Sequence, residues 1–445
     1  MPEIASPPAS TLTPAKTARQ RTDTFTSIWM IIAVAMALVT LVVKNRMPQP
    51  LWTIIHLVTL GVLSNGIFQW SWFFARSLAR LSADDPRARR HNTIRILIFN
   101  ACFLLLFVSM WLGWMVGTMI AATGIAAVAA WHGAEMLSVL RERLASRFVI
   151  VVRYYVCSAS FFVLAALLAS FVSATMFSPS IPEALVAMRD RLTLAHALSG
   201  VAGWVGLTIG GTVITLGPTI LRTRMSPDAV SGGVRVLLPW CLSLLLAIAG
   251  ALLGVMPLVG AGILAVGTCA IVGIVCPYAK VLRNKGPREY SAWSFLLGLL
   301  WISVGVCALG VASLFVSTPS QLRALTLMWL PIIGIAGFAQ LFQGALSYLM
   351  PVVIGGGPSV VRIGIAIIDW QYSLRLGLRN GALILELFLF FTSESSSVQV
   401  LRTAGWLLVI ATFVIDVVIY AKTGVAQARA RRARSETLSE SRQVQ

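Results

Sequence analysis

Long apolar runs alternate with short polar connections along almost the whole chain. Each run is close to or above the roughly 20 residues that an α-helix needs to cross a bilayer. The pattern therefore predicts an all-α, polytopic membrane helical bundle of about twelve transmembrane helices. The predicted spans are 25–43, 51–75, 93–113, 115–138, 148–175, 193–220, 233–256, 257–281, 291–316, 323–353, 375–392 and 401–422. Two of the turns between them, at Leu112 to Val116 and at Met256-Pro257, must be very tight.

The basic residues predict which way the helices run. If the N-terminus is cytoplasmic, the outer connections hold only six of the 35 Lys and Arg residues, namely Lys44, Arg46, Arg189, Arg191, Arg323 and Arg402. The other basic residues then lie on the inner side, as the positive-inside rule requires. We therefore expect both termini to be cytoplasmic and the protein to be a multi-pass protein of a bacterial plasma membrane.

Composition supports a single membrane domain between two tails. The chain is 58% hydrophobic and only 11% charged, whereas about a quarter of the residues of a soluble domain are charged. The predicted organisation is a disordered cytoplasmic tail over 1–24, a twelve-helix domain over 25–422 and a basic cytoplasmic tail over 423–445. The net charge of +19 sits in the connections, so the expected partner is the lipid bilayer and not nucleic acid.

Two histidines are the first candidates for a bound cofactor. His56 and His196 both lie near the outer starts of inward-running spans, the second and the sixth, and so at similar depth. Imidazole suits copper and haem iron, so the pair predicts a haem or copper site near the outer face. The alternative is two interfacial histidines whose nitrogens are satisfied by backbone or water.

The helix that carries His196 also has a face of small residues. On a helical projection Ser199, Gly203, Gly206, Gly210 and Gly217 fall within an arc of about 60° beside the histidine. Such a face could seat a flat cofactor. It could equally let another helix approach closely, as small residues commonly do in membranes.

Sulfur offers weaker candidates for copper. The six cysteines all lie in apolar runs, which argues against disulfides, and only Cys269 and Cys276 share a helix face. Met115 and Met119 lie one turn apart near tryptophans. Core packing and an aromatic belt at the membrane surface explain these residues as well as Cu⁺ binding does.

Ionisable residues inside spans suggest a proton relay. His132 and Glu135 are three residues apart on one helix face, and Glu386 and Asp416 lie within spans eleven and twelve. Arg379 is a possible partner for Glu386. Each of these groups could instead pack as a neutral or paired side chain, or reach the membrane surface.

Three segments carry a family resemblance. HLVTLGVLSNGIFQWSWFFA at His56, AHALSGVAGWVGLTIGGTVITLGPTILRTRM at His196 and FAQLFQGALSYLMPVVIGGGP in span ten resemble the membrane domain associated with actinobacterial multicopper oxidases and copper nitrite reductases. That domain is similar to the twelve-helix haem-copper oxidases and to NnrS-type membrane proteins. The resemblance implies ligand roles for His56, for haem, and His196, for copper. It also implies a multicopper oxidase, cupredoxin or respiratory complex as partner.

The resemblance also sets a limit on activity. The oxidase pattern needs further histidines on helices seven and ten, and spans seven and ten contain none, with Gln340 and Gln343 the comparable polar groups on span ten. A complete oxygen-reducing or nitric-oxide-reducing centre is therefore not expected. The leading hypothesis is a haem- or copper-binding membrane protein that serves electron transfer, metal handling or nitric-oxide-related respiration. The alternatives are a proton-coupled secondary transporter, and an assembly factor for a respiratory or copper complex.

Overall fold

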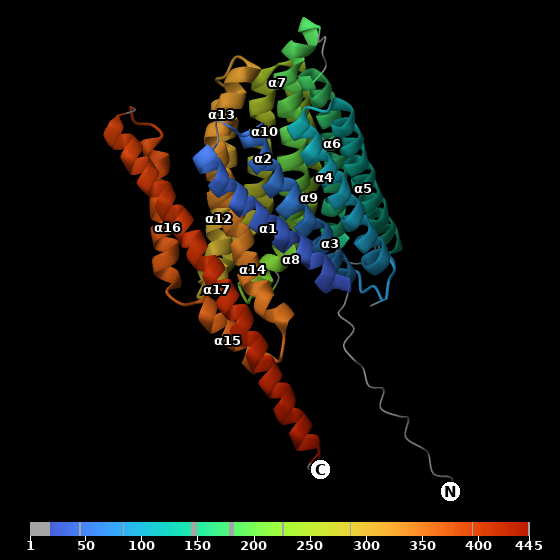
Figure 1. Cartoon of the computed structure of the whole chain (residues 1–445), viewed down its shortest axis with the longest axis vertical. Coiled ribbons are helices and arrows are strands. Elements are labelled where there is room, and N and C mark those ends of the chain that lie inside the picture. Colours follow the sequence, from blue (N-terminus) through green and yellow to red (C-terminus); the bar gives the residue numbers. More distant parts are fainter. Residues whose placement is uncertain are drawn as a thin grey trace. The chain divides into compact units, whose positions relative to one another are not determined.

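The described part of the protein is entirely helical. The computed structural model describes residues 18–43, 46–82, 84–143, 149–177, 182–224, 227–284, 286–393 and 395–443, and no strand occurs within these ranges. The chain forms two compact units, Met1–Gly211 and Thr212–Gln445. Figure 1 labels the helices in chain order. The all-α prediction is confirmed.

Ten helical stretches in the described ranges are long and apolar enough to cross a membrane, so the fold fits a multi-pass membrane protein. They are Pro50–Leu78, Arg87–Leu112, Met115–Glu142, Val149–Phe177, Met188–Ile220, Pro227–Leu253, Met256–Arg283, Tyr290–Ser313, Pro319–Ile354 and Ser396–Glu436. The first and eleventh predicted spans are also helical, but they are not among the ten helices that are long and apolar enough to cross a membrane. The apolar part of the first is only Phe25–Thr40, and the eleventh carries three charged residues. Twelve crossings and the side of each terminus therefore stay predictions.

Unit 1 is built from six helical stretches, several of them interrupted by a wider π-helical segment. In chain order they are α1 (Ala18–Val43), α2 (Pro50–His56) with η2 (Leu57–Ser64) and α3 (Asn65–Leu78), η3 (Arg87–His91) with α4 (Asn92–Leu112), α5 (Met115–Glu142), α6 (Val149–Phe177), and α7 (Glu183–Ala197) with η4 (Leu198–Gly206) and the start of α8 (Leu207–Ile220). Residues 1–17 of the predicted N-terminal tail lie outside the described residues, while α1 already begins at Ala18.

The core of unit 1 is aromatic, with polar bonds between helices. Phe162 of α6 stacks on Trp204 of η4 with ring centroids 4.6 Å apart. Asn100 of α4 donates to the side chain of Asn65 of α3 at 2.7 Å, and this bond joins the two helices. Gly113, with φ 64°, makes the tight turn between α4 and α5 that the sequence requires.

Unit 2 holds the end of α8 and the remaining helices. They are α9 (Pro227–Leu253), α10 (Met256–Ala270) with η5 (Ile271–Val275) and α11 (Cys276–Asn284), α12 (Tyr290–Ser313), α13 (Pro319–Pro331) with η6 (Ile332–Ala339) and α14 (Gln340–Ile354), α15 (Pro358–Ile368), α16 (Tyr372–Leu389) and α17 (Ser396–Gln443). Gly254, with φ 75°, makes the second tight turn, between α9 and α10. The predicted basic tail is the continuation of α17.

Glycines let α12 lie directly on α14. A Cβ added to Gly298 would lie 2.7 Å from the Cα of Leu341, and one added to Gly344 would lie 2.8 Å from the carbonyl oxygen of Ser291. Contacts this short leave no room for a side chain. The two backbones therefore meet at a small-residue interface of the kind that replaces the hydrophobic effect inside a bilayer.

Candidate metal site and buried charge networks

His56 is fixed by its own helix. It is the last residue of α2 and directly precedes the π-helical segment η2. Its Nδ1 lies 2.8 Å from the carbonyl oxygen of Trp52, and the Trp52 ring stacks on the imidazole with centroids 4.3 Å apart. Because a carbonyl oxygen only accepts, Nδ1 carries the proton and Nε2 keeps its lone pair.

His196 is fixed by a neighbouring helix. It lies in the last turn of α7, two residues before the π-helical segment η4. Its Nδ1 lies 2.8 Å from the carbonyl oxygen of Ala165 on α6, so the same tautomer follows. Both histidines thus sit where an α-helix widens into a π-helix, a feature that often accompanies functional sites.

The two imidazoles lie together inside unit 1. Their ring centroids are 6.1 Å apart and their planes differ by only 10°. Two imidazoles bound end-on to one metal ion, with metal–nitrogen distances of about 2.0 Å, have centroids about 6 Å apart. A carbonyl bond to the other ring nitrogen is also how metal-binding histidines are usually oriented. The pair is therefore a candidate site for one transition-metal ion, and the two histidines lie close enough together to serve one site.

The small-residue face beside His196 serves helix packing. A Cβ on Gly203 would lie 2.8 Å from Cγ of Phe161, so an aromatic side chain of α6 already covers this position. Gly217 is covered in the same way by the phenol of Tyr278 within unit 2. At these two glycines the face receives aromatic side chains of the protein itself and has no room for a cofactor.

The sulfur candidates add nothing to the histidine pair. None of the six cysteines forms a disulfide, and Cys276 is exposed. Among the residues that the structure describes, no group of three or more His, Cys, Asp and Glu side chains converges on a metal position. The histidine pair therefore gains no third His, Cys, Asp or Glu ligand among these residues.

His132 and Glu135 do not form the predicted pair. His132 is fully buried, and its Nε2 lies 3.3 Å from the hydroxyl of Ser71. Glu135 instead binds Arg95, and accepts a bond from His91 Nδ1 at 2.7 Å. The fully buried Arg95 requires a carboxylate, because an unpaired buried charge is costly, and this need decides where Glu135 points.

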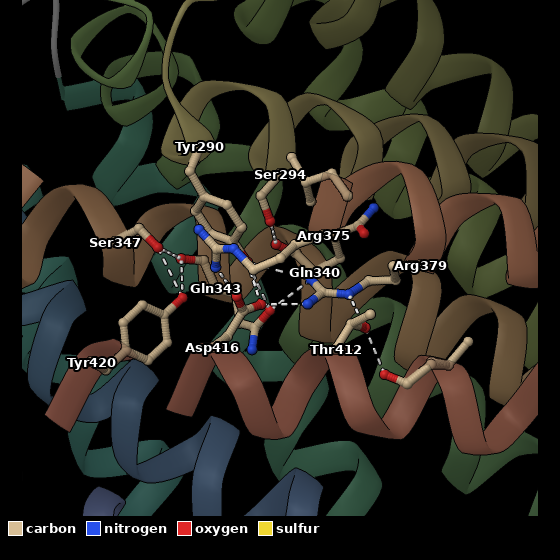
Figure 2. Close-up of polar contacts among 12 residues, drawn as sticks. Tyr290, Ser294, Gln340, Gln343, Ser347, Arg375, Arg379, Thr412, Asp416 and Tyr420 are labelled. Carbon is tan, nitrogen blue, oxygen red and sulfur yellow. Dashed lines mark hydrogen bonds and ion pairs between the residues drawn. The ribbon is translucent and has the colours of Figure 1, made fainter. Parts of the chain in front are cut away.

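A second charge network lies within unit 2, shown in Figure 2. Asp416 of α17 binds two arginines of α16, Arg375 and Arg379, and also accepts a bond from Tyr290 at 2.6 Å. All four side chains are buried. Sequence reasoning singled out Asp416 but missed its partners, although two arginines four residues apart on one span are a detectable signal.

Each arginine in this network has further acceptors. Arg379 donates to Gln343 at 2.9 Å and to Thr412 at 3.0 Å. Arg375 donates to the carbonyl oxygens of Ile368 and Trp370, which lie at the C-terminal end of α15. The partial negative charge of that helix end offsets the second positive charge. A network with its donors this fully satisfied holds helices together and offers no open ligand position.

Glu386 is separate from this network, and Arg379 is not its partner. Its Oε2 lies 3.8 Å from Nε of Arg402, and its buried Oε1 has no hydrogen-bond partner. The four residues expected to relay protons therefore belong to different surroundings. Among the described residues, no hydrogen bond or ion pair joins any two of these four side chains.

Compared with known proteins, the chain matches no family model and no curated relative. The interpretation of the site therefore rests on its geometry.

Proposed function

We propose that the protein is a multi-pass membrane protein that binds one Cu⁺ ion between His56 and His196. The observation that carries the proposal is the near-parallel pair of imidazoles with centroids 6.1 Å apart. Both Nδ1 atoms are already bonded to backbone carbonyls, which leaves both Nε2 atoms available as ligands.

The number and kind of ligands favour Cu⁺ over other metals. Imidazole suits copper, and Cu⁺ is stable with two ligands in a line. Zinc in proteins takes four ligands, and calcium and magnesium need six or more oxygens or waters. A haem is a poorer fit, because Phe161 covers Gly203, one of the small residues that were expected to seat it.

Two neutral ligands also indicate how the ion is used. A structural metal site is normally closed by four protein ligands, whereas a two-ligand site leaves the ion open to attack by an incoming ligand. We therefore infer that the ion is cargo or an electron carrier. The setting we infer is a bacterial plasma membrane with both termini cytoplasmic. The expected partner is a multicopper oxidase or cupredoxin, in line with the family resemblance.

Copper binding by the purified full-length protein tests the proposal. Protein loaded with Cu⁺ under reducing, anaerobic conditions is expected to retain one copper per chain against a competing chelator. Its X-ray absorption spectrum is expected to show two nitrogen neighbours and no sulfur. Either His56→Ala or His196→Ala should abolish retention, while His91→Ala serves as a matched control because His91 binds Glu135 elsewhere in unit 1.

The alternatives give different results. A haem protein would show a Soret band that disappears in the double variant His56→Ala/His196→Ala. Cu⁺ retention unchanged in both single variants, or a wild-type protein without copper, would refute the proposal. Thermal unfolding of each variant separates loss of the site from loss of the fold.

A further inference from the structure

The loop between α14 and α15 is held by the basic end of α17. Gln427 donates to the carbonyl oxygen of Pro351 at 2.6 Å. One and two turns further on, Arg431 donates to the carbonyl oxygen of Ile354 at 2.9 Å, and Arg434 donates to that of Gly356 at 2.9 Å. This end of α17 is thus docked on the loop, and its arginines have defined positions.

Three guanidinium groups lie at the loop, and no described carboxylate forms an ion pair with any of them. Arg431 and Arg434 come from α17, and Arg362 of α15 turns back to the carbonyl oxygen of Pro358 at 3.3 Å. Within the described part of the chain all bonds of these three side chains go to neutral oxygens. All three residues are exposed. Each therefore keeps several N–H donors and its full positive charge for an external anion.

The start of α15 adds to this positive field. The helix begins at Pro358, and its N-cap, Gly357, provides no side chain to bond the free backbone N–H groups. A helix N-terminus carries partial positive charge and favours anions. Arg434 donates to the hydroxyl of Ser359 in the first turn of α15 at 3.0 Å. Its positive charge adds to that of the helix end.

Apolar surface lies directly beside the three arginines. Val352 and Val353, in the last turn of α14, are 51% and 46% exposed, and Ile363 on α15 is 41% exposed. Trp370, beyond the opposite end of α15, is 59% exposed as well, and tryptophan is typical of the membrane surface. An anion with apolar chains attached would contact the arginines with its charged group and the exposed apolar side chains with its chains.

We propose that Arg362, Arg431 and Arg434, with the N-terminus of α15, form a binding site for the phosphate headgroup of an anionic phospholipid. Guanidinium groups match phosphate oxygens with paired hydrogen bonds. The acyl chains lie against Val352, Val353 and Ile363. The site lies wholly within unit 2 and is independent of the copper proposal.

Lipid retention by the full-length protein tests this site. Wild-type protein and two triple variants are compared in nanodiscs of phosphatidylcholine with and without phosphatidylglycerol, and retained lipids are counted by native mass spectrometry. The first variant is Arg362→Gln/Arg431→Gln/Arg434→Gln. The control variant is Lys422→Gln/Arg429→Gln/Arg432→Gln, which removes the same number of positive charges, all of them from α17. Retention of phosphatidylglycerol should fall at least about tenfold in the first variant and change little in the control.

Other outcomes overturn the proposal. Equal loss in both variants would mean that only the overall charge of the helix end attracts lipid. No loss in either would place the lipid elsewhere. If inorganic phosphate alone raises the unfolding temperature of the wild type as much as phosphatidylglycerol does, the site binds free phosphate and not lipid. If the triple glutamine variant does not fold, Arg→Lys at the same three positions replaces it, and unchanged retention in that variant would contradict recognition by guanidinium groups.

Discussion

Asp416 is the residue whose loss should weaken unit 2 most. It is fully buried and, among the described residues, is the only carboxylate that forms an ion pair with Arg375 and Arg379. The substitution Asp416→Asn keeps the shape of the side chain but removes its charge. Two buried guanidinium groups then face a neutral amide. One of the two carboxylate oxygens that accepted their hydrogen bonds is replaced by an NH₂ group, which can only donate.

The magnitude follows from this geometry. Breaking a buried ion pair by removing one partner costs about 3–5 kcal/mol, because the remaining charge stays buried without compensation. The carbonyls at the end of α15 still stabilise Arg375, so the lower half of that range is expected for Asn, and more for Ala. Most of the cost should come from Arg379, whose remaining acceptors are neutral.

Unfolding by SDS in mixed micelles, followed by tryptophan fluorescence, measures this change. The control is Glu142→Gln, which removes a carboxylate from Arg87 at a site where the Glu142 side chain is 50% exposed. An exposed pair contributes no more than about 1 kcal/mol. In the double variant Asp416→Asn/Arg379→Gln part of the lost stability should return, because the unpaired charge is gone. A loss at Asp416→Asn no larger than that of the control would refute the reasoning.

Three further predictions concern other parts of the molecule. Gly298→Ala should destabilise unit 2 by about 1–3 kcal/mol in the same unfolding assay, since its Cβ would meet the backbone of α14. Glu135→Gln should destabilise unit 1 by about 3–5 kcal/mol, because the fully buried Arg95 loses its carboxylate, and Glu135→Asp should cost less. The hydrogen bond from Arg87 lowers the pKa of Asp85 below its ordinary value of 3.8, so this contact stabilises the protein at neutral pH. Its contribution should disappear as pH falls through the lowered pKa, and Asp85→Asn should flatten the acid limb of a stability profile.

The sequence predicts the parts of the fold that depend on local pattern. Ten of the predicted spans are helices long and apolar enough to cross a membrane in the described ranges, and Gly113 and Gly254 make the two tight turns where the apolar runs left almost no connecting residues. The eleventh predicted span shows the limit of this reasoning. Its arginines reduce its apolar character, and the residue that compensates them lies on α17, 37 and 41 residues further along the chain.

The same division holds for the candidate site. Equal depth on two even-numbered spans made His56 and His196 candidates for one site, and the structure places their rings 6.1 Å apart. The bonds that set their tautomers could not be predicted in the same way. One acceptor is four residues away on the same helix, but the other is the carbonyl of Ala165, 31 residues earlier on α6. A backbone acceptor on another helix has no sequence signal, because every residue carries the same carbonyl group.

The two ends of α15 connect the buried network with the proposed lipid site. At its C-terminal end, the carbonyls of Ile368 and Trp370 receive Arg375, a favourable pairing of cation with negative helix end. At its N-terminal end, the positive helix end faces Arg434, which is an unfavourable pairing of like charge. An anion between them would reverse the sign of that interaction. The binding of a lipid phosphate should therefore also stabilise α15 on α14 and α17. Protection of the α15 backbone from hydrogen exchange should rise when phosphatidylglycerol is added, and no rise would count against this coupling.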